Sequence, residues 1–305
     1  MGMKRVLDKI RFAKTFPKYK TSKGVISGYE EYNKHFEVAI NLAKAEELKP
    51  RYDNFYQTSF HKTYKGKSEK TALHFSFGSG KQGPYIGIEC TPYKLTDDEW
   101  IDVRALFTVI FGGPEVIAKK FRLSEIELAV DIPQKFNDLI FIAPRFRSQN
   151  AQSVKLGTLE IGSKKGGRWI RIYDKKKQLQ QAKGIHIPAP LTRIEYVRRR
   201  LKFSLASWLG MPNPFNEILV VPRHKVGEIK KIDPSDFIFS HFAKKISDGA
   251  LGLTAYWSIE DADMRKVIRK KLAPHALNIA GTKTDWDAWI NSEINILRNR
   301  FKPDK

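Results

Sequence analysis

Short stretches in which apolar and polar residues alternate run through the first two thirds of the chain, a pattern typical of half-buried β-strands. The alternation predicts strands within 51–66, 71–90, 123–132, 157–178 and 191–200. Two of these stretches fold back as hairpins, because GSGKQGP interrupts 71–90 and GSKKGGR interrupts 157–178. The first 30 residues are basic and rich in turn-forming residues, and we predict no regular element there.

Helical spacing of apolar residues appears at 30–48 and 95–113. In the second stretch, Thr96 is placed to cap the helix at its N-terminus, and Gly112 and Gly113 are placed to end it. Beyond about residue 203 the pattern is mainly helical, with predicted helices at 203–210, 234–251, 261–273 and 284–301.

These elements predict an α+β fold. We expect a largely antiparallel sheet that carries a site on one face, with flanking helices and a helical C-terminal region. The change in pattern places a domain boundary at 203, with a sheet domain over 1–203 and a mainly helical region over 204–305.

The charge of the chain points to a polyanionic partner. Lysine and arginine number 55 against 33 acidic residues, a net charge of +22. Thirteen of the basic residues lie between 164 and 202, where the acids are only Asp174 and Glu195. Nucleic acid is the commonest partner for such a local basic patch.

Cysteine and hydropathy narrow the class of protein further. The single cysteine, Cys90, excludes an internal disulfide and a zinc site built on cysteines. The N-terminal residues lack the apolar core of a signal peptide, and no stretch is apolar enough to span a membrane. We therefore expect a soluble cytoplasmic protein.

Strand periodicity gathers acidic residues on one face of the predicted sheet. Side chains two residues apart share a face, so the face opposite the apolar one collects a set of polar residues. Its members are Glu89, Glu127, Asp131, Glu195, Arg171 and Tyr173.

Two interpretations of this face stay open. It is either an ordinary solvated face, or a carboxylate cluster that binds a hard cation such as Mg²⁺ or Mn²⁺. A solvated face of so basic a protein should carry mainly lysine and arginine, which favours the cation. None of the seven histidines has the spacing of a metal pair, and GSKKGGR is not a phosphate-binding loop.

Four segments, in order, resemble the Rep_trans-type rolling-circle replication initiators of plasmids and mobile elements. The segments are IECTPYKLTDDE (88–99), SEIELAVD (124–131), EIGSKKGGRWIRIYDKKK (160–177) and LTRIEYVRR (191–199). The resemblance covers about residues 85–200. It departs from the family pattern at Gln178, where a glutamate is usual, and at Glu127, where aspartate is often found.

The resemblance implies a chemistry for the acidic face. Tyr173 corresponds to the tyrosine that cleaves DNA and becomes covalently linked to it, which leaves a free 3′-OH. Glu89, Glu127, Asp131 and Glu195 correspond to ligands of Mg²⁺ or Mn²⁺. Arg171 and Lys175 are placed to hold the phosphate or to favour the tyrosine phenolate.

The remaining cations are candidate contacts to the DNA backbone, which set affinity rather than sequence choice. They are Lys164, Lys165, Arg168, Lys176, Lys177, Arg198, Arg199 and Arg200. The implied partner is origin DNA, single-stranded or in a cruciform hairpin at the nick site with a duplex flank. A host helicase and a second copy of the chain are further candidate partners, and no membrane is expected.

Other functions also fit the sequence. A relaxase of an integrative or conjugative element would use the same chemistry. A non-catalytic nucleic-acid module would instead use Tyr173 and Trp169 to stack bases. The region 204–305 is expected to serve DNA specificity, dimerisation or both, and the basic helix at 261–273 either enters a DNA groove or is a solvated face.

Overall fold

The computed structural model describes residues 3–16, 27–45, 47–53, 56–64, 70–80, 83–146, 158–232, 236–250 and 252–303. Within these ranges the fold is α+β with a nine-stranded antiparallel sheet, flanking helices and C-terminal helices, as predicted. The strand order is β2-β3-β4-β5-β1-β6-β10-β9-β8, and β7 pairs with β11 in a separate two-stranded sheet.

The strands are β1 (Lys4–Thr15), β2 (Lys49–Asp53), β3 (Tyr56–Tyr64), β4 (Lys70–Gly80), β5 (Gly83–Cys90), β6 (Arg122–Ile132), β7 (Leu139–Ile142), β8 (Thr158–Ser163), β9 (Arg168–Asp174), β10 (Thr192–Arg199) and β11 (Leu219–Pro222). The helices are α1 (Ser27–Lys44), α2 (Asp97–Phe111), α3 (Pro114–Lys120), α4 (Lys175–Lys183), α5 (Arg223–Ile232), α6 (Phe237–Ser247), α7 (Gly252–Trp257), α8 (Ala262–Leu272) and α9 (Lys283–Arg300). Among the helices of the described ranges, none is long and apolar enough to cross a membrane.

The chain divides into two compact units, which we describe separately. Unit 1 comprises Met1–Arg5, Ala129–Val197 and Pro212–Trp286. Unit 2 comprises Val6–Leu128, Arg198–Met211 and Asp287–Lys305.

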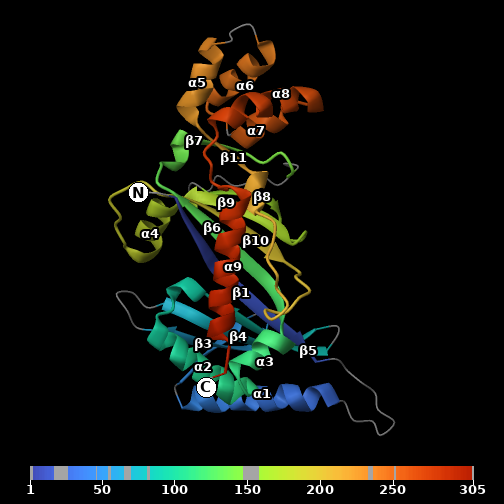
Figure 1. The fold of residues 1–305 in the computed structure, drawn as a ribbon. Helices are drawn as coiled ribbons and strands as arrows, with labels where there is room; N and C mark the ends of the chain where they lie inside the picture. The colour runs from blue at the N-terminus through green and yellow to red at the C-terminus, as the bar shows by residue number, and fades with distance from the viewer. Residues whose placement is uncertain are drawn as a thin grey trace. The chain divides into compact units, whose positions relative to one another are not determined.

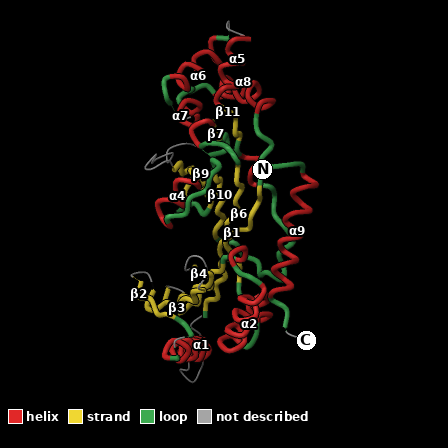
Figure 2. The backbone as a smooth tube through the Cα atoms, turned by 90° about the vertical axis from the view of Figure 1, so that its left-hand side faces the viewer, coloured by secondary structure: helices red, strands yellow, loops and turns green. Residues whose placement is uncertain are grey.

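Unit 2 is built on the antiparallel pairs β2–β3, β3–β4, β4–β5 and β5–β1. Helix α1 lies beside β2 to β4 (Figure 2), and its Tyr32 and Phe36 contact the ring of Phe77. Helix α2 begins as predicted, because Thr96 and Glu99 exchange hydrogen bonds in a capping box. It ends at Gly112, whose φ of 84° is a conformation that favours glycine.

The hairpin β8–β9 in unit 1 carries the basic segment noted in the sequence. Its register places Thr158 opposite Tyr173 and Glu160 opposite Arg171. The predicted turn is present at residues 164–167, and Gly167 occupies it with φ 77°. Alternation along β9 sends Ile170 and Ile172 to one face and Arg171 and Tyr173 to the other, as the sequence pattern predicts.

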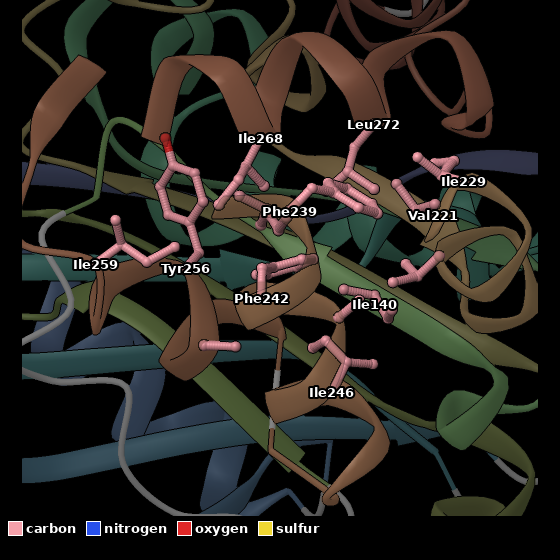
Figure 3. Packing of buried hydrophobic residues seen from close by; sticks show 14 residues of the cluster. Ile140, Val221, Ile229, Phe239, Phe242, Ile246, Tyr256, Ile259, Ile268 and Leu272 are labelled. Atoms are coloured by element: carbon pink, nitrogen blue, oxygen red, sulfur yellow. The ribbon is translucent and has the colours of Figure 1, made fainter. Parts of the chain in front are cut away.

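The C-terminal part of unit 1 has its own hydrophobic core. Figure 1 shows α5 to α8 gathered beside β7 and β11, and Figure 3 shows the side chains that hold them together. Phe239 and Phe242 of α6 contact each other within a cluster that also contains Ile268 and Leu272 of α8. Apolar burial therefore fixes these short helices, which would be marginal alone.

Three sequence predictions about secondary structure are wrong. Residues 4–15 form a strand, because Ile10 and Phe12 alternate with basic residues that had suggested a loop. The stretch 51–66 contains two paired strands, β2 and β3, rather than one, and residues 54–55 lie outside the described ranges.

The third wrong prediction is the helix at 203–210, which is a turn. The side chains of Ser204 and Ser207 bond to backbone groups within this turn and compete with helix formation. Gly210, with φ 120°, follows them and breaks the helical pattern.

The cluster in Figure 3 predicts the effect of a core truncation. Phe242→Ala should lower the free energy of unfolding by about 3–5 kcal/mol, because it removes a fully buried ring and leaves a cavity. His241→Ala alters the exposed neighbour on the same helix and should change stability by no more than ~0.5 kcal/mol. Chemical denaturation followed by circular dichroism measures both. Equal effects would contradict the packing described here.

Candidate active site

Tyr173 lies near the end of β9, and its hydroxyl is engaged in a buried hydrogen bond. The residue is 6% exposed. Its hydroxyl donates to Oε1 of Glu195 on β10 at 2.5 Å. The side chain of Lys175 reaches the same hydroxyl oxygen from 3.3 Å and lies over the tyrosine ring. The phenol proton is thus directed at a carboxylate, and a cation stands beside the oxygen that would become charged.

Glu195 joins Tyr173 to Arg171. Its second oxygen, Oε2, lies 2.8 Å from Nη2 of Arg171. Because Arg171 and Tyr173 are two residues apart on β9, both project from the same face toward this one carboxylate. The two oxygens of Glu195 thus have different partners, the Tyr173 hydroxyl and the Arg171 guanidinium.

The change from strand to helix after Tyr173 positions Lys175. Asp174 ends β9 and caps α4, and its side chain accepts a hydrogen bond from the backbone N–H of Lys177. Lys175 also donates to the amide oxygen of Gln178 at 3.0 Å. Gln178 is thus a neutral partner of this lysine.

Asp131 is held in a largely buried ion pair. Its two carboxylate oxygens accept hydrogen bonds from Nε and Nη2 of Arg193, at 2.6 Å and 2.7 Å. This is the bidentate geometry that makes arginine–carboxylate pairs strong. The structure therefore places Asp131 with Arg193, on neighbouring strands.

Lys9 of β1 lies among three carboxylates, those of Glu89 and Glu127 from the acidic face and that of Glu125 from β6. Its ammonium lies 3.1 Å from Glu125, 3.4 Å from Glu127 and 3.8 Å from Glu89. Burial by itself would lower the pKa of Lys9, but the three carboxylates together raise it above its usual value. For Glu125, burial acts to raise the pKa, and the opposing effects of Lys9 and Arg199 bring it below the usual range.

Three buried acids form a group suited to a cation. Asp8 and Glu127 of unit 2 and Glu195 of unit 1 are all buried, and each offers a carboxylate oxygen as a possible ligand. Hard divalent ions prefer such oxygen ligands, so the donor set fits Mg²⁺ or Mn²⁺. Glu127 and Glu195 are buried, which contradicts the solvated-face interpretation for these two residues.

The group overlaps the predicted ligands only in part. Glu127 and Glu195 belong to it, whereas Glu89 is half-buried beside Lys9 and Asp131 is paired with Arg193. Asp8 was missed, because no strand was predicted over residues 4–15. Strict alternation would also have assigned it to the apolar face of Ile10. The sequence feature that could have identified Asp8 is that it is the only acid in KRVLDKIRF, a segment in which basic and apolar residues alternate.

The proposed DNA contacts lie in three places. Lys164 and Lys165 are exposed at the β8–β9 turn, Lys176 and Lys177 lie in the first turn of α4, and residues 198–200 are exposed at the end of β10. Two arginines of this set have other partners: Arg168 pairs with Glu217 and lies over the ring of Phe146, and Arg199 pairs with Glu125.

Comparison with known proteins gives a distant likeness. No family model matches the chain, and no curated protein matches it. Among solved structures it is similar to the rolling circle replication initiator protein from Geobacillus stearothermophilus, with 18% sequence identity and a TM-score of 0.33. The similarity covers 65% of this chain and 75% of that one.

The acid group predicts which substitutions weaken metal binding. Asp8→Asn and Glu127→Gln should each raise the dissociation constant for Mn²⁺ by at least the roughly 10-fold expected when only an outer partner of a ligand is removed. Manganese titration followed by electron paramagnetic resonance measures this constant directly. Glu160→Gln, a change on β8 outside the group, is the control. Unchanged affinity in both test variants would contradict a metal site here.

Asp131→Asn should behave differently in the same titration. Its carboxylate is occupied by Arg193, so we expect a smaller change in Mn²⁺ affinity than Glu127→Gln produces. The free energy of unfolding should instead fall by about 3–5 kcal/mol, because a buried arginine loses its charged partner. A loss of Mn²⁺ affinity at unchanged stability would make Asp131 a ligand after all.

Proposed function

We propose that this chain is a rolling-circle replication initiator that nicks and rejoins origin DNA through a covalent phosphotyrosine. The observation that carries the proposal is the contact of the Tyr173 hydroxyl with Glu195 and Lys175. Tyr173 and Lys175 lie in the segment that resembles the cleavage motif of that family, and Glu195 lies in the last of the four resembling segments. A nucleophilic hydroxyl needs a base to take its proton and a cation to stabilise the resulting charge, and both are in place.

The residues suggest the following course of reaction. Glu195 accepts the proton of Tyr173, and Lys175 stabilises the phenolate, which attacks the phosphorus of the scissile phosphodiester. The bond from phosphorus to the 3′ oxygen breaks as the bond to the tyrosine oxygen forms, and the 3′ oxygen takes a proton from water. The products are a 5′-phosphotyrosine and a free 3′-OH, and the reverse attack reseals the strand.

The acid group gives the proposed enzyme a place for a divalent ion. Asp8, Glu127 and Glu195 would hold Mg²⁺ or Mn²⁺, which would polarise the scissile phosphate and neutralise charge on its oxygens. Glu195 would then serve three partners, since it also accepts the tyrosine hydrogen bond and pairs with Arg171. The chemistry of nicking and the binding of the ion are therefore expected to fail together when this residue is changed.

The burial of two aromatic rings argues against a non-catalytic base-stacking module. Stacking needs exposed ring faces, but Tyr173 and Trp169 are 6% and 5% exposed. A relaxase of an integrative element would use the same residues. Nicking assays on a replication origin and on a transfer origin would separate those two roles.

Tyr173→Phe should abolish the covalent protein–DNA adduct while DNA affinity stays within a few-fold, because a single hydroxyl is lost and the ring still packs. The measurement is a denaturing gel after incubation with labelled single-stranded origin DNA and Mn²⁺. Tyr196→Phe, another buried tyrosine on the adjoining strand β10, is the matched control and should still form the adduct. An adduct formed by the Tyr173→Phe variant would sink the assignment of the nucleophile.

Lys175→Met should slow adduct formation by on the order of 100-fold, the usual cost of losing one group that stabilises developing charge. The defect should shrink as pH rises, since a more alkaline medium favours the phenolate that the lysine otherwise stabilises. Lys177→Met removes an exposed charge from the same helix and should weaken DNA binding without this pH dependence. Parallel pH–rate profiles for both variants would argue against a special role for Lys175.

A further inference from the structure

Unit 1 contains an open groove that the proposed chemistry does not use. It has a volume of about 620 Å³ and lies where the loop after β6 meets the start of α5. Lys135, Arg223 and His224 supply its basic side chains, and Pro133, Pro190 and Pro222 supply apolar walls. The size is within the range of small-molecule sites, which is roughly 300–1,000 Å³.

The chemistry of this lining suits a nucleotide. Basic side chains attract phosphate, and the flat, weakly hydrated faces of proline rings can pack against a sugar or a base. Arg223 is fixed in place, because its guanidinium donates to the backbone carbonyls of Asn137 and Ile246. Asp138 is the one acid on the wall, and its charge opposes an anionic ligand.

The wall of the groove is bonded to the segment that carries Tyr173. The backbone N–H of Lys175 donates to the carbonyl of Leu191, the residue after Pro190. Lys176 donates to the carbonyl of Pro188, and Thr192 donates to the carbonyl of Gln134, another residue of the groove wall. Segment 188–192 thus contributes Pro190 to the groove wall and is hydrogen-bonded to the first turn of α4, which follows Tyr173 and Asp174.

We propose that this groove binds one nucleotide of the DNA strand being cut, with its phosphate against Lys135, His224 and Arg223. The inference rests on the proposed function, because it takes the ligand to be the strand held at Tyr173. The groove would act as a positioning subsite: it fixes the strand at a second point, so that the scissile phosphate is presented to the nucleophile in one register.

The test measures binding of a fluorescein-labelled single-stranded oligonucleotide by anisotropy across a range of salt concentrations. Lys135→Ala should weaken binding about three- to ten-fold and reduce the salt slope by about 0.7, the value for one phosphate contact to a single strand. Lys244→Ala removes an exposed lysine of α6 in the same unit and is the matched control. Equal losses of affinity in the two variants would show only general electrostatic attraction of the oligonucleotide to the protein. That result would overturn the proposal that the groove binds a nucleotide.

A second pair of variants tests whether oligonucleotide affinity can be raised rather than lowered. Asp138→Asn removes the opposing charge from the groove wall and should tighten binding about two- to three-fold, whereas Asp248→Asn at an exposed site in the same unit should not. Deoxynucleoside monophosphate and inorganic phosphate serve as competitors. If the nucleotide competes with the oligonucleotide but phosphate does not, the groove is a nucleotide site. If both compete equally, the groove binds anions in general and the proposal is overturned.

Failure of this inference can be told apart from failure of the proposed function. If the wild type forms the covalent adduct while Lys135→Ala and Asp138→Asn match their controls, the groove is wrong and the nicking chemistry stands. If binding depends on the groove but no adduct forms, the nucleotide subsite stands and the nicking enzyme is wrong.

Discussion

Buried carboxylates are the constraint around which the acidic face is organised. An ionised acid loses its hydration when it is buried, and the loss is tolerable only where cations and hydrogen-bond donors replace the water. Each acid here meets that demand differently. Glu195 is neutralised by Arg171, Asp131 by Arg193, and Glu125 by Lys9 and Arg199. The chain's excess of basic residues therefore serves the protein's own interior as well as any DNA.

The engagement of Glu195 has a particular consequence for the tyrosine. Its Oε1 accepts the hydrogen bond of the Tyr173 hydroxyl, so that hydroxyl has a fixed direction in which to donate. Lys175 also donates a hydrogen bond to that hydroxyl oxygen, from 3.3 Å. The carboxylate that pairs with Arg171 is thus the same one that orients the Tyr173 hydroxyl.

Sequence periodicity predicted the sheet and the face of Glu127, Glu195 and Tyr173, because alternation in strands is a local property that needs no knowledge of partners. It missed β1, since a strand made of alternating basic and apolar residues looks like a basic loop, and with β1 it missed Asp8 and Lys9. Its assignment of Arg168 and Arg199 to DNA stays a prediction. Charge can be read from a sequence, but the glutamates that engage these two arginines come from distant segments.

The position of Asp174 sets a limit on how this segment can vary. It is both the last residue of β9 and the N-cap of α4, so the strand gives way to a helix that begins two residues after the tyrosine. One added residue at this junction would turn every following side chain of α4 by about 100° around the helix axis. Lys175 would still be present in the sequence, but its ammonium would no longer contact the Tyr173 hydroxyl. The number of residues between Tyr173 and Lys175 must therefore stay constant. Insertions and deletions among relatives should be confined to the turn at 164–167 and to the C-terminal end of α4.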